Sequence, residues 1–245
     1  MVTRDAWLTK LFNAHLAAPG NALLAMFHQK ADNPLEPWAD FIVMQLFVAL
    51  LIVALLLIMR KRLSVNQPGK LQHIFEVIYE FINDQAHDQV GHDSQRHTLI
   101  FTTLFVFILS ANLIGVIPGF VSPTQSAYVT AGCALVAFIY YNIAGLRKNG
   151  LLGYGKHFLG PVWWLAPLMI PIEIVSHLAR PLSLTIRLFA NMFAGEKVTL
   201  AFLGLTYLVI PSIFMGLHVF VAFLQAYIFV LLTMIYVGGA VAEEH

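Results

Sequence analysis

The sequence predicts an all-α fold, a polytopic membrane helix bundle of about 5–6 membrane helices. Of the 245 residues, 59% are hydrophobic and only 11% are charged, whereas a soluble protein carries about 25% charged residues. Two long runs, 98–144 and 199–242, contain no Asp, Glu, Lys or Arg. Because a membrane helix needs about 20 apolar residues, these runs are long enough to cross a bilayer.

Composition also excludes several classes of function. The net charge is +1 and the longest basic run is Arg60-Lys61-Arg62, so no nucleic-acid partner is expected. The single cysteine, Cys133, can form no internal disulfide and is expected to pack in an apolar segment. No cleaved signal peptide is expected. Four histidines precede the second apolar segment, but their spacing matches no standard metal-ligand set, and neither a metal nor a cofactor is expected: His73, His87, His92 and His97.

The first part of the chain divides into three segments. Prolines interrupt any long helix in residues 1–38, which are expected to be external. Residues 39–59 form the first predicted transmembrane helix, and the basic run follows it directly. By the positive-inside rule this end is cytoplasmic and the N-terminus is outside. Residues 60–97 form a cytoplasmic amphipathic segment, because apolar residues recur in it at helical spacing.

A pair of transmembrane helices is predicted over 98–144, and the basic residues Arg147 and Lys148 follow it on the cytoplasmic side. Asn112 is the one strongly polar side chain deep in the first of these helices. We expect it to join helices by hydrogen bonds, and a functional role is the alternative. Residues 145–160 are Gly-rich and are expected to form a cytoplasmic loop.

Residues 161–245 are expected to form the channel. A single helix over 161–197 would be about 55 Å long, which exceeds the ~30 Å hydrocarbon core. It must therefore tilt strongly, break, or lie partly outside lipid. Segment 199–242 fits either two spans that turn near Pro211 or one long tilted helix, and its composition leaves both open.

A polar stripe marks this region. At about 100° per residue, five polar side chains share an arc of roughly 80°, with Ser183 at its edge. The five are Glu173, His177, Arg180, Arg187 and Asn191. A charge deep in a membrane helix costs about 3 kcal/mol on insertion scales, so it normally faces protein or water and marks a function. A helix lying flat on the membrane surface is the alternative, but such a helix would carry more lysines.

The stripe suits proton transfer around a fixed charge. Arg187 cannot lose its proton, so it can attract a carboxylate and block direct passage of protons. On a helix, Glu173 lies about 21 Å to its cytoplasmic side and Glu196 about 13 Å to its outer side. Together with His177 and His218, these carboxylates are the residue types of intramembrane proton relays. No carboxylate lies beside Arg187 on its own helix face, so a partner protein is the simplest source of one.

At these residues the chain resembles the a subunit of F-type rotary ATP synthases. The resemblance rests on PLSLTIRLFANMFAGE at 181–196, on a Glu fourteen residues before the arginine, and on His218 and Gln225 seven residues apart. It continues in PGKLQHIFEVIYEFI at 68–82, NLIGVIPG, FLQAYIFVLLTMIYV and the terminal EEH.

The resemblance implies a non-catalytic proton-channel subunit beside a rotating ring of c subunits, whose carboxylates would supply the missing anion. Arg187 would face the ring. Glu196, His218 and Gln225 would belong to the outer half-channel and the interface with the ring. The polar positions between the arginine and the cytoplasm would be Glu173, Ser183 and Asn191, with His177 and Arg180 as supporting contacts.

The resemblance also implies an architecture and partners. The last two segments would be long, strongly tilted helices that form a hairpin against the c-ring, which favours one helix over 199–242 with the C-terminus inside. The other partners would be peripheral-stalk b subunits, the remainder of the ATP synthase and the lipid bilayer. A bacterial plasma membrane is expected as the location, because the chain is compact and no transit peptide is apparent.

Two other classes of protein are weighed against this. A self-contained proton-coupled secondary transporter would show inverted repeats and broken helices, and the N-terminal half has no counterpart of the Arg187 stripe. An intramembrane enzyme would show a nucleophile with a base or an HExxH motif. HExxH is absent, and Glu173 with His177 would be an incomplete metal-ligand set. No enzymatic activity is expected of this chain itself.

Overall fold

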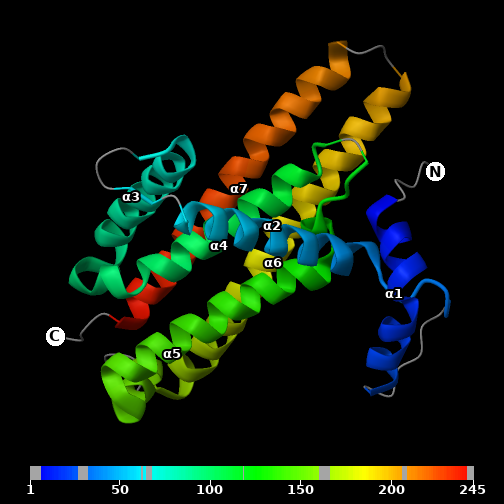
Figure 1. Cartoon of the computed structure of the whole chain (residues 1–245). Coiled ribbons are helices and arrows are strands. Elements are labelled where there is room, and N and C mark those ends of the chain that lie inside the picture. Colours follow the sequence, from blue (N-terminus) through cyan, green and yellow to red (C-terminus); the bar gives the residue numbers. More distant parts are fainter. Residues whose placement is uncertain are drawn as a thin grey trace.

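A computed structural model describes residues 7–26, 33–61, 63–64, 68–117, 119–159, 166–205 and 209–241. Within these ranges the chain is helical and contains no strand, so the predicted all-α class is confirmed. The helices are α1 (Trp7–Met26), α2 (Asp40–Arg60), α3 (Lys70–Val90), α4 (Thr98–Ile114), α5 (Ala127–Leu159), α6 (Ala166–Leu205) and α7 (Val209–Val241), with 3-10 turns η1 (Gly91–Arg96) and η2 (Pro123–Gln125) (Figure 1).

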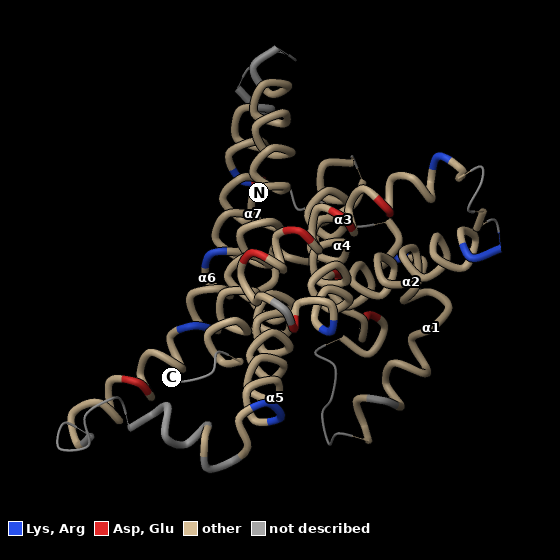
Figure 2. Tube along the Cα trace, turned by 90° about the vertical axis from the view of Figure 1, so that its left-hand side faces the viewer, with Lys and Arg blue, Asp and Glu red and all other residues tan. Residues whose placement is uncertain are grey.

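Three of the described helices are long and apolar enough to cross a bilayer: α2, α5 as far as Gly150, and α7 from Pro211. Helix α4 is also apolar but has 17 residues. Figure 2 shows that charged residues are sparse along α4 and α7, whereas α6 carries charges of both signs along its length. The long apolar helices fit a polytopic membrane bundle. Helix α6 differs from them because its sequence carries charged residues.

The hydrophobic core lies where α4, α5, α6 and α7 meet, with α3 packed on the ends of α4 and α7. Phe101 and Phe105 of α4, Tyr141 of α5 and Phe229 of α7 are among its largest buried side chains. Many Leu, Ile and Val residues on the outer helix faces are exposed instead. Helices that are apolar on every face bury one side in protein and present the other to lipid.

Helices α6 and α7 lie side by side as an antiparallel pair (Figure 1). Helix α6 has 40 residues and is unbroken despite Pro171 and Pro181, so from residue 166 on the segment does not break. It continues to Leu205, and α7 then starts at Val209. The expectation of one helix over 199–242 is therefore wrong at its start, because 199–205 complete α6.

Pro211 does not interrupt α7, since it occupies the first helical turn, where no intrahelical N–H is required. The Gly-rich segment also differs from the expected loop. Helix α5 continues to Leu159 with one interruption at Gly150, whose φ of 69° lies in the left-handed region that glycine adopts without strain. The glycines there mark a break in a helix, not a loop.

Candidate functional site

Helix α6 has one buried and one open face. Its buried face is formed by His177, Leu184, Leu188 and Met192, which recur at intervals of seven and four residues. Its open face consists of exposed residues, most of them three or four positions apart: Ser183, Arg187, Ala190, Asn191 and Ala194. Because a helix repeats every 3.6 residues, the same segment packs against α5 and α7 while presenting a polar, small-residue surface.

The first group of polar side chains lies near the start of α6, and its charges are balanced by residues of the same chain. Glu173 Oε1 is 3.8 Å from His177 Nδ1 and 3.7 Å from Arg180 Nη2. The Arg180 guanidinium carbon lies 5.2 Å from the ring centre of Tyr236 and 5.9 Å from that of Tyr141. Both distances are within the range of cation–π attraction. One arginine therefore has a carboxylate and two aromatic rings from this chain.

Arg187, seven residues further along α6, has a different environment. Its side chain is exposed, and no hydrogen bond or ion pair joins it to another residue of the described ranges. The nearby residues of the open face are mostly small, with Ala190 and Ala194 beyond the arginine. Small residues on a membrane helix let another helix approach closely. The surface thus leaves a cation open to a partner at short range.

The second polar group joins α6 to α7. Asn191 Nδ2 donates a 2.7 Å hydrogen bond to Oε1 of Gln225, which is only 2% exposed. One turn further on, Gly195 lies against the His218 ring so closely that a Cβ at this position would clash with it. The glycine is required by this close approach. Along α6, Asn191 lies beyond Arg187 on the side of Glu196, whereas Glu173 and Ser183 lie on the other side of the arginine.

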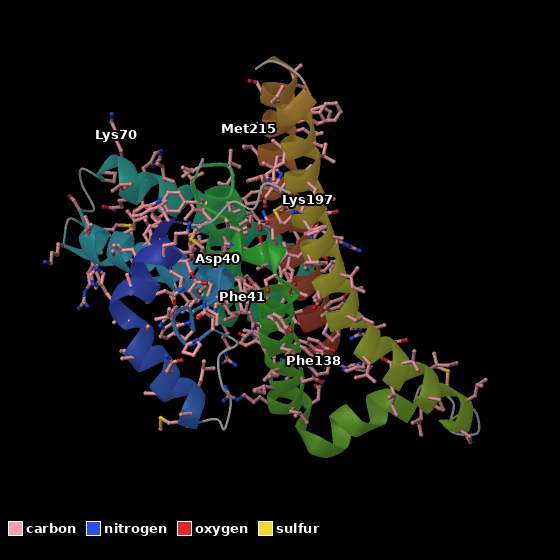
Figure 3. The ribbon with its side chains drawn as sticks, turned by 90° about the vertical axis from the view of Figure 1, so that its right-hand side faces the viewer. Asp40, Phe41, Lys70, Phe138, Lys197 and Met215 are labelled. Carbon is pink, nitrogen blue, oxygen red and sulfur yellow. The ribbon has the colours of Figure 1, made fainter. Side chains whose placement is uncertain are left out.

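Glu196 and His218 line the same pocket of about 40 Å³, together with Thr199, Met215 and residues at the end of α4. A water molecule needs roughly 10–15 Å³ measured in this way, so the pocket can hold a few. A larger groove of about 240 Å³ lies between α6 and α7 and includes Asn191. His218 borders both spaces. Figure 3 shows Lys197 on α6 and Met215 on α7 near this level of the helix pair.

Asn112 has the structural role expected of it. Its side chain is fully buried, its Nδ2 donates to the Ala222 carbonyl at 3.1 Å, and its Oδ1 accepts from the Thr124 hydroxyl at 2.7 Å. It therefore ties α4 to α7 and to the η2 turn. Among the described residues, the Ser183 hydroxyl makes a local contact, since it donates to the Arg180 carbonyl in the same helix.

The structure thus brings together three sets of predicted residues: Glu173 with His177 and Arg180, Asn191 with Gln225, and Glu196 with His218. Sequence analysis missed Tyr141, Tyr236 and Gly195. The tyrosines lie in uniformly apolar helices, where periodicity does not distinguish one position from another, and nothing in the local sequence pairs them with α6. The described ranges contain no group of three or more His, Cys, Asp or Glu arranged to hold a metal ion.

An all-helical chain with apolar spans and one charge-bearing helix open to a partner defines a membrane channel or transporter subunit. Residues 42–238 match the family described as ATP synthase A chain, and the chain belongs to this family. It is 60% identical over 235 residues to ATP synthase subunit a of Solibacter usitatus (strain Ellin6076), covering 96% of this chain and 100% of that one. It is 48% identical over 239 residues to ATP synthase subunit a of Koribacter versatilis (strain Ellin345), covering 98% of both.

A more distant relative, ATP synthase subunit a of Geobacter sulfurreducens, is 39% identical over 226 residues, covering 91% of this chain and 98% of the relative. The family assignment confirms the predicted resemblance and the proton-channel class. The chain is a non-catalytic membrane subunit and part of an ATP synthase complex. A self-contained secondary transporter is not favoured.

Proposed function

We propose that this chain supplies two offset aqueous half-channels and one fixed charge, Arg187, which exchange protons with the carboxylates of a rotating c-subunit ring. Proton flow through the two half-channels then drives ring rotation and ATP synthesis. One observation carries the proposal: Arg187 is exposed on a small-residue surface and has no anionic partner within the described chain. A carboxylate on a neighbouring helix satisfies that charge.

The outer half-channel runs through the pocket that Glu196 and His218 share. Because His218 also borders the groove that contains Asn191, it can relay a proton from the pocket to the open face of α6. Glu196 and His218 are titratable groups of the kind found in intramembrane relays. The Asn191–Gln225 hydrogen bond keeps the helix pair in register at the end of this route.

The inner half-channel begins at the cluster of Glu173, His177 and Arg180. On the α6 axis Glu173 and Glu196 lie on opposite sides of Arg187, separated from it by about 21 Å and 13 Å. A proton cannot pass directly between the halves, because the guanidinium stays charged and repels it. It must instead travel on the ring.

Arg187 acts on each ring carboxylate in turn. At about 4 Å and an effective dielectric constant near 20, opposite unit charges attract by about 4 kcal/mol. This attraction favours ionisation, so a protonated ring carboxyl that approaches Arg187 releases its proton to the exit side. The resulting carboxylate accepts another proton on the entry side. The arginine positions and deprotonates, but carries no proton itself.

For the orientation, we propose an external N-terminus and a cytoplasmic C-terminus in a bacterial plasma membrane. The basic residues Arg60 and Lys61 at the end of α2, and Arg147 and Lys148 in α5, support it through the positive-inside rule. The c-ring would pack on the open face of α6. Peripheral-stalk b subunits would hold the chain still while the ring turns.

Cysteine cross-linking in the assembled membrane complex tests this arrangement. In a Cys133→Ala background, Ala190→Cys and Ala194→Cys lie on the open face, whereas Leu50→Cys on α2 lies at a position 65% exposed and serves as the matched control. We expect the first two to cross-link to cysteines placed near the c-subunit carboxylate, and the control not to do so. Cross-linking of the control alone would refute the proposed interface.

A further inference from the structure

Beyond the proton route, we propose that the pocket where η1, α5 and the end of α7 meet binds the phosphate headgroup of an anionic phospholipid. This pocket has a volume of about 310 Å³. Its polar lining comes from Asp93, Arg96, His97, Tyr140, Arg147 and Lys148. None of these residues belongs to the proposed half-channels or to the surface around Arg187.

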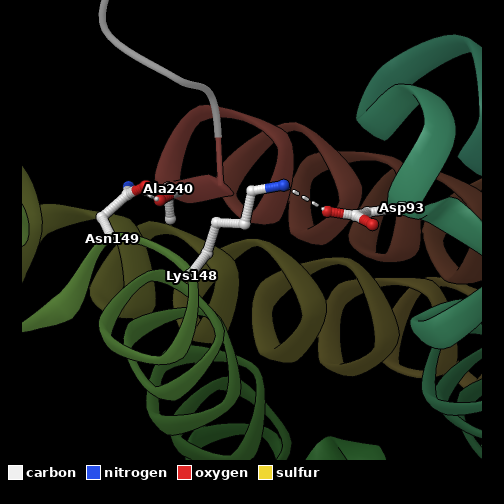
Figure 4. A network of polar contacts seen from close by, with 4 residues as sticks. All are labelled: Asp93, Lys148, Asn149 and Ala240. Atoms are coloured by element: carbon white, nitrogen blue, oxygen red, sulfur yellow. Dashed lines mark hydrogen bonds and ion pairs between the residues drawn. The ribbon is translucent and has the colours of Figure 1, made fainter.

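Among the residues that the structure describes, the pocket lining carries an excess of positive charge. Lys148 Nζ is 2.7 Å from Asp93 Oδ2, and Figure 4 shows this pair spanning from α5 to η1. The lysine holds the pKa of Asp93 below its ordinary value, so the pair stays ionised at neutral pH and its charges cancel. Arg96 and Arg147 form no ion pair with a carboxylate of the described residues, although the charge of Arg96 also acts on Asp93. Arginine binds phosphate oxygens through two parallel N–H donors.

Hydrogen bonds hold the pocket in shape. His97 Nδ1 and the Tyr140 hydroxyl are 2.7 Å apart, which joins η1 to α5. Burial lowers the pKa of His97, so its ring stays neutral at neutral pH and the permanent cations dominate. Asn149 Nδ2 donates to the Ala240 carbonyl at 3.0 Å, which joins α5 to the end of α7 (Figure 4). The basic groups therefore sit in a structured pocket, not on a free loop.

The surface beside the pocket favours a lipid over a soluble phosphate. Val136, Ile139 and Ile143 are exposed and share one face of α5 with Arg147, at intervals of three and four residues. From Val136 to Arg147 this face extends about 17 Å, close to half of the ~30 Å hydrocarbon core. Acyl chains can lie along it while the headgroup occupies the pocket. Basic pockets between membrane helices at this level bind anionic headgroups.

The test is to titrate the purified full chain in mild detergent with phosphatidylglycerol and count bound lipids by native mass spectrometry. Phosphatidylcholine and glycerol 3-phosphate are the comparison probes. Each basic residue near a headgroup contributes about a fivefold gain in affinity. Arg96→Gln or Arg147→Gln should therefore weaken phosphatidylglycerol binding about fivefold, and the double variant roughly 25-fold. The control Arg60→Gln, an exposed basic residue outside the pocket, should leave it unchanged.

A second variant separates binding from structural damage. Asp93→Asn removes the anion that neutralises Lys148, so it should strengthen phosphatidylglycerol binding, a result that simple disruption of the pocket would not produce. Arg147→Lys, which keeps the charge, should fall between the parent and Arg147→Gln. Equal binding of phosphatidylcholine, equal binding of glycerol 3-phosphate, or unchanged affinity in the double variant would each overturn the proposal.

Discussion

Two arginines on the same helix have opposite environments. Arg180 lies 3.7 Å from a Glu173 carboxylate oxygen and close to the rings of Tyr141 and Tyr236. Arg187 is exposed and makes no ion pair within the described ranges. A cation that its own chain neutralises contributes to folding. A cation that the chain leaves open in an apolar helix indicates a partner, since isolated charge is costly there.

The largest expected effect comes from Arg187→Gln, which should lower proton-driven ATP synthesis by roughly 100-fold or more, as is typical when a preorganised charge is removed. Folding should change little, because the side chain makes no hydrogen bond or ion pair with the described residues. ATP synthesis in energised vesicles measures the loss, and co-purification of the c-ring reports assembly. Lys197→Gln on the same helix is the control. Full ATP synthesis by the Arg187→Gln variant would show that this charge is not needed, and the distinction between Arg187 and Arg180 would fail.

The next effect concerns proton entry. Glu196→Gln and His218→Gln should each reduce proton flux about tenfold, since they remove a proton donor–acceptor from a pocket that is large enough for water. Flux is measured with a pH-sensitive dye in vesicles stripped of the catalytic sector, and ring binding should persist. Glu80→Gln, an exposed carboxylate on α3, is the matched control. Normal flux in both variants would remove the pocket from the route.

Arg180→Gln should act on stability more than on coupling. It removes the cation from Glu173 and the two tyrosines, at a cost of about 1–2 kcal/mol. Thermal unfolding of the purified chain should show the loss, and Glu173→Gln combined with Arg180→Gln should recover part of it. If Arg180→Gln abolished ATP synthesis as completely as Arg187→Gln, the distinction between the two arginines would fail.

Asn191→Ala removes the hydrogen bond to buried Gln225, so the free energy of unfolding should fall by about 1 kcal/mol. The same substitution should loosen the α6–α7 pair near Gly195. Gln225→Ala and the double variant complete a double-mutant cycle, whose coupling energy reports the bond itself. Strictly additive losses would show that the bond contributes nothing.

Ser183→Ala should have the smallest effect, within about 0.5 kcal/mol, and ATP synthesis should be unaffected. Its hydroxyl bonds a carbonyl of its own helix, which is a local contact that a helix replaces easily. A large loss of proton flux would instead place Ser183 on the inner half-channel, as the family resemblance implied.

Much of this arrangement could be predicted from the sequence. Uninterrupted apolar runs predict helices because lipid leaves the backbone no other hydrogen-bond partner, and helical spacing alone puts Glu173, Arg187 and Asn191 on one stripe. The end of α6 at Leu205 and the break at Gly150 could not be located, since neighbouring residues there are equally compatible with helix.

The contacts that these polar side chains make with other helices were decided only by the tertiary structure. The order of residues along one helix determines that Arg187 lies between Glu173 and Glu196, because the axial rise per residue is constant. Glu173 lies on the same helix as Arg180, but the two aromatic rings beside this arginine are there because α5 and α7 bring Tyr141 and Tyr236 to it. Contacts between distant segments follow from packing of side chains that look alike in an apolar sequence, so only the tertiary structure distinguishes Arg180 from Arg187.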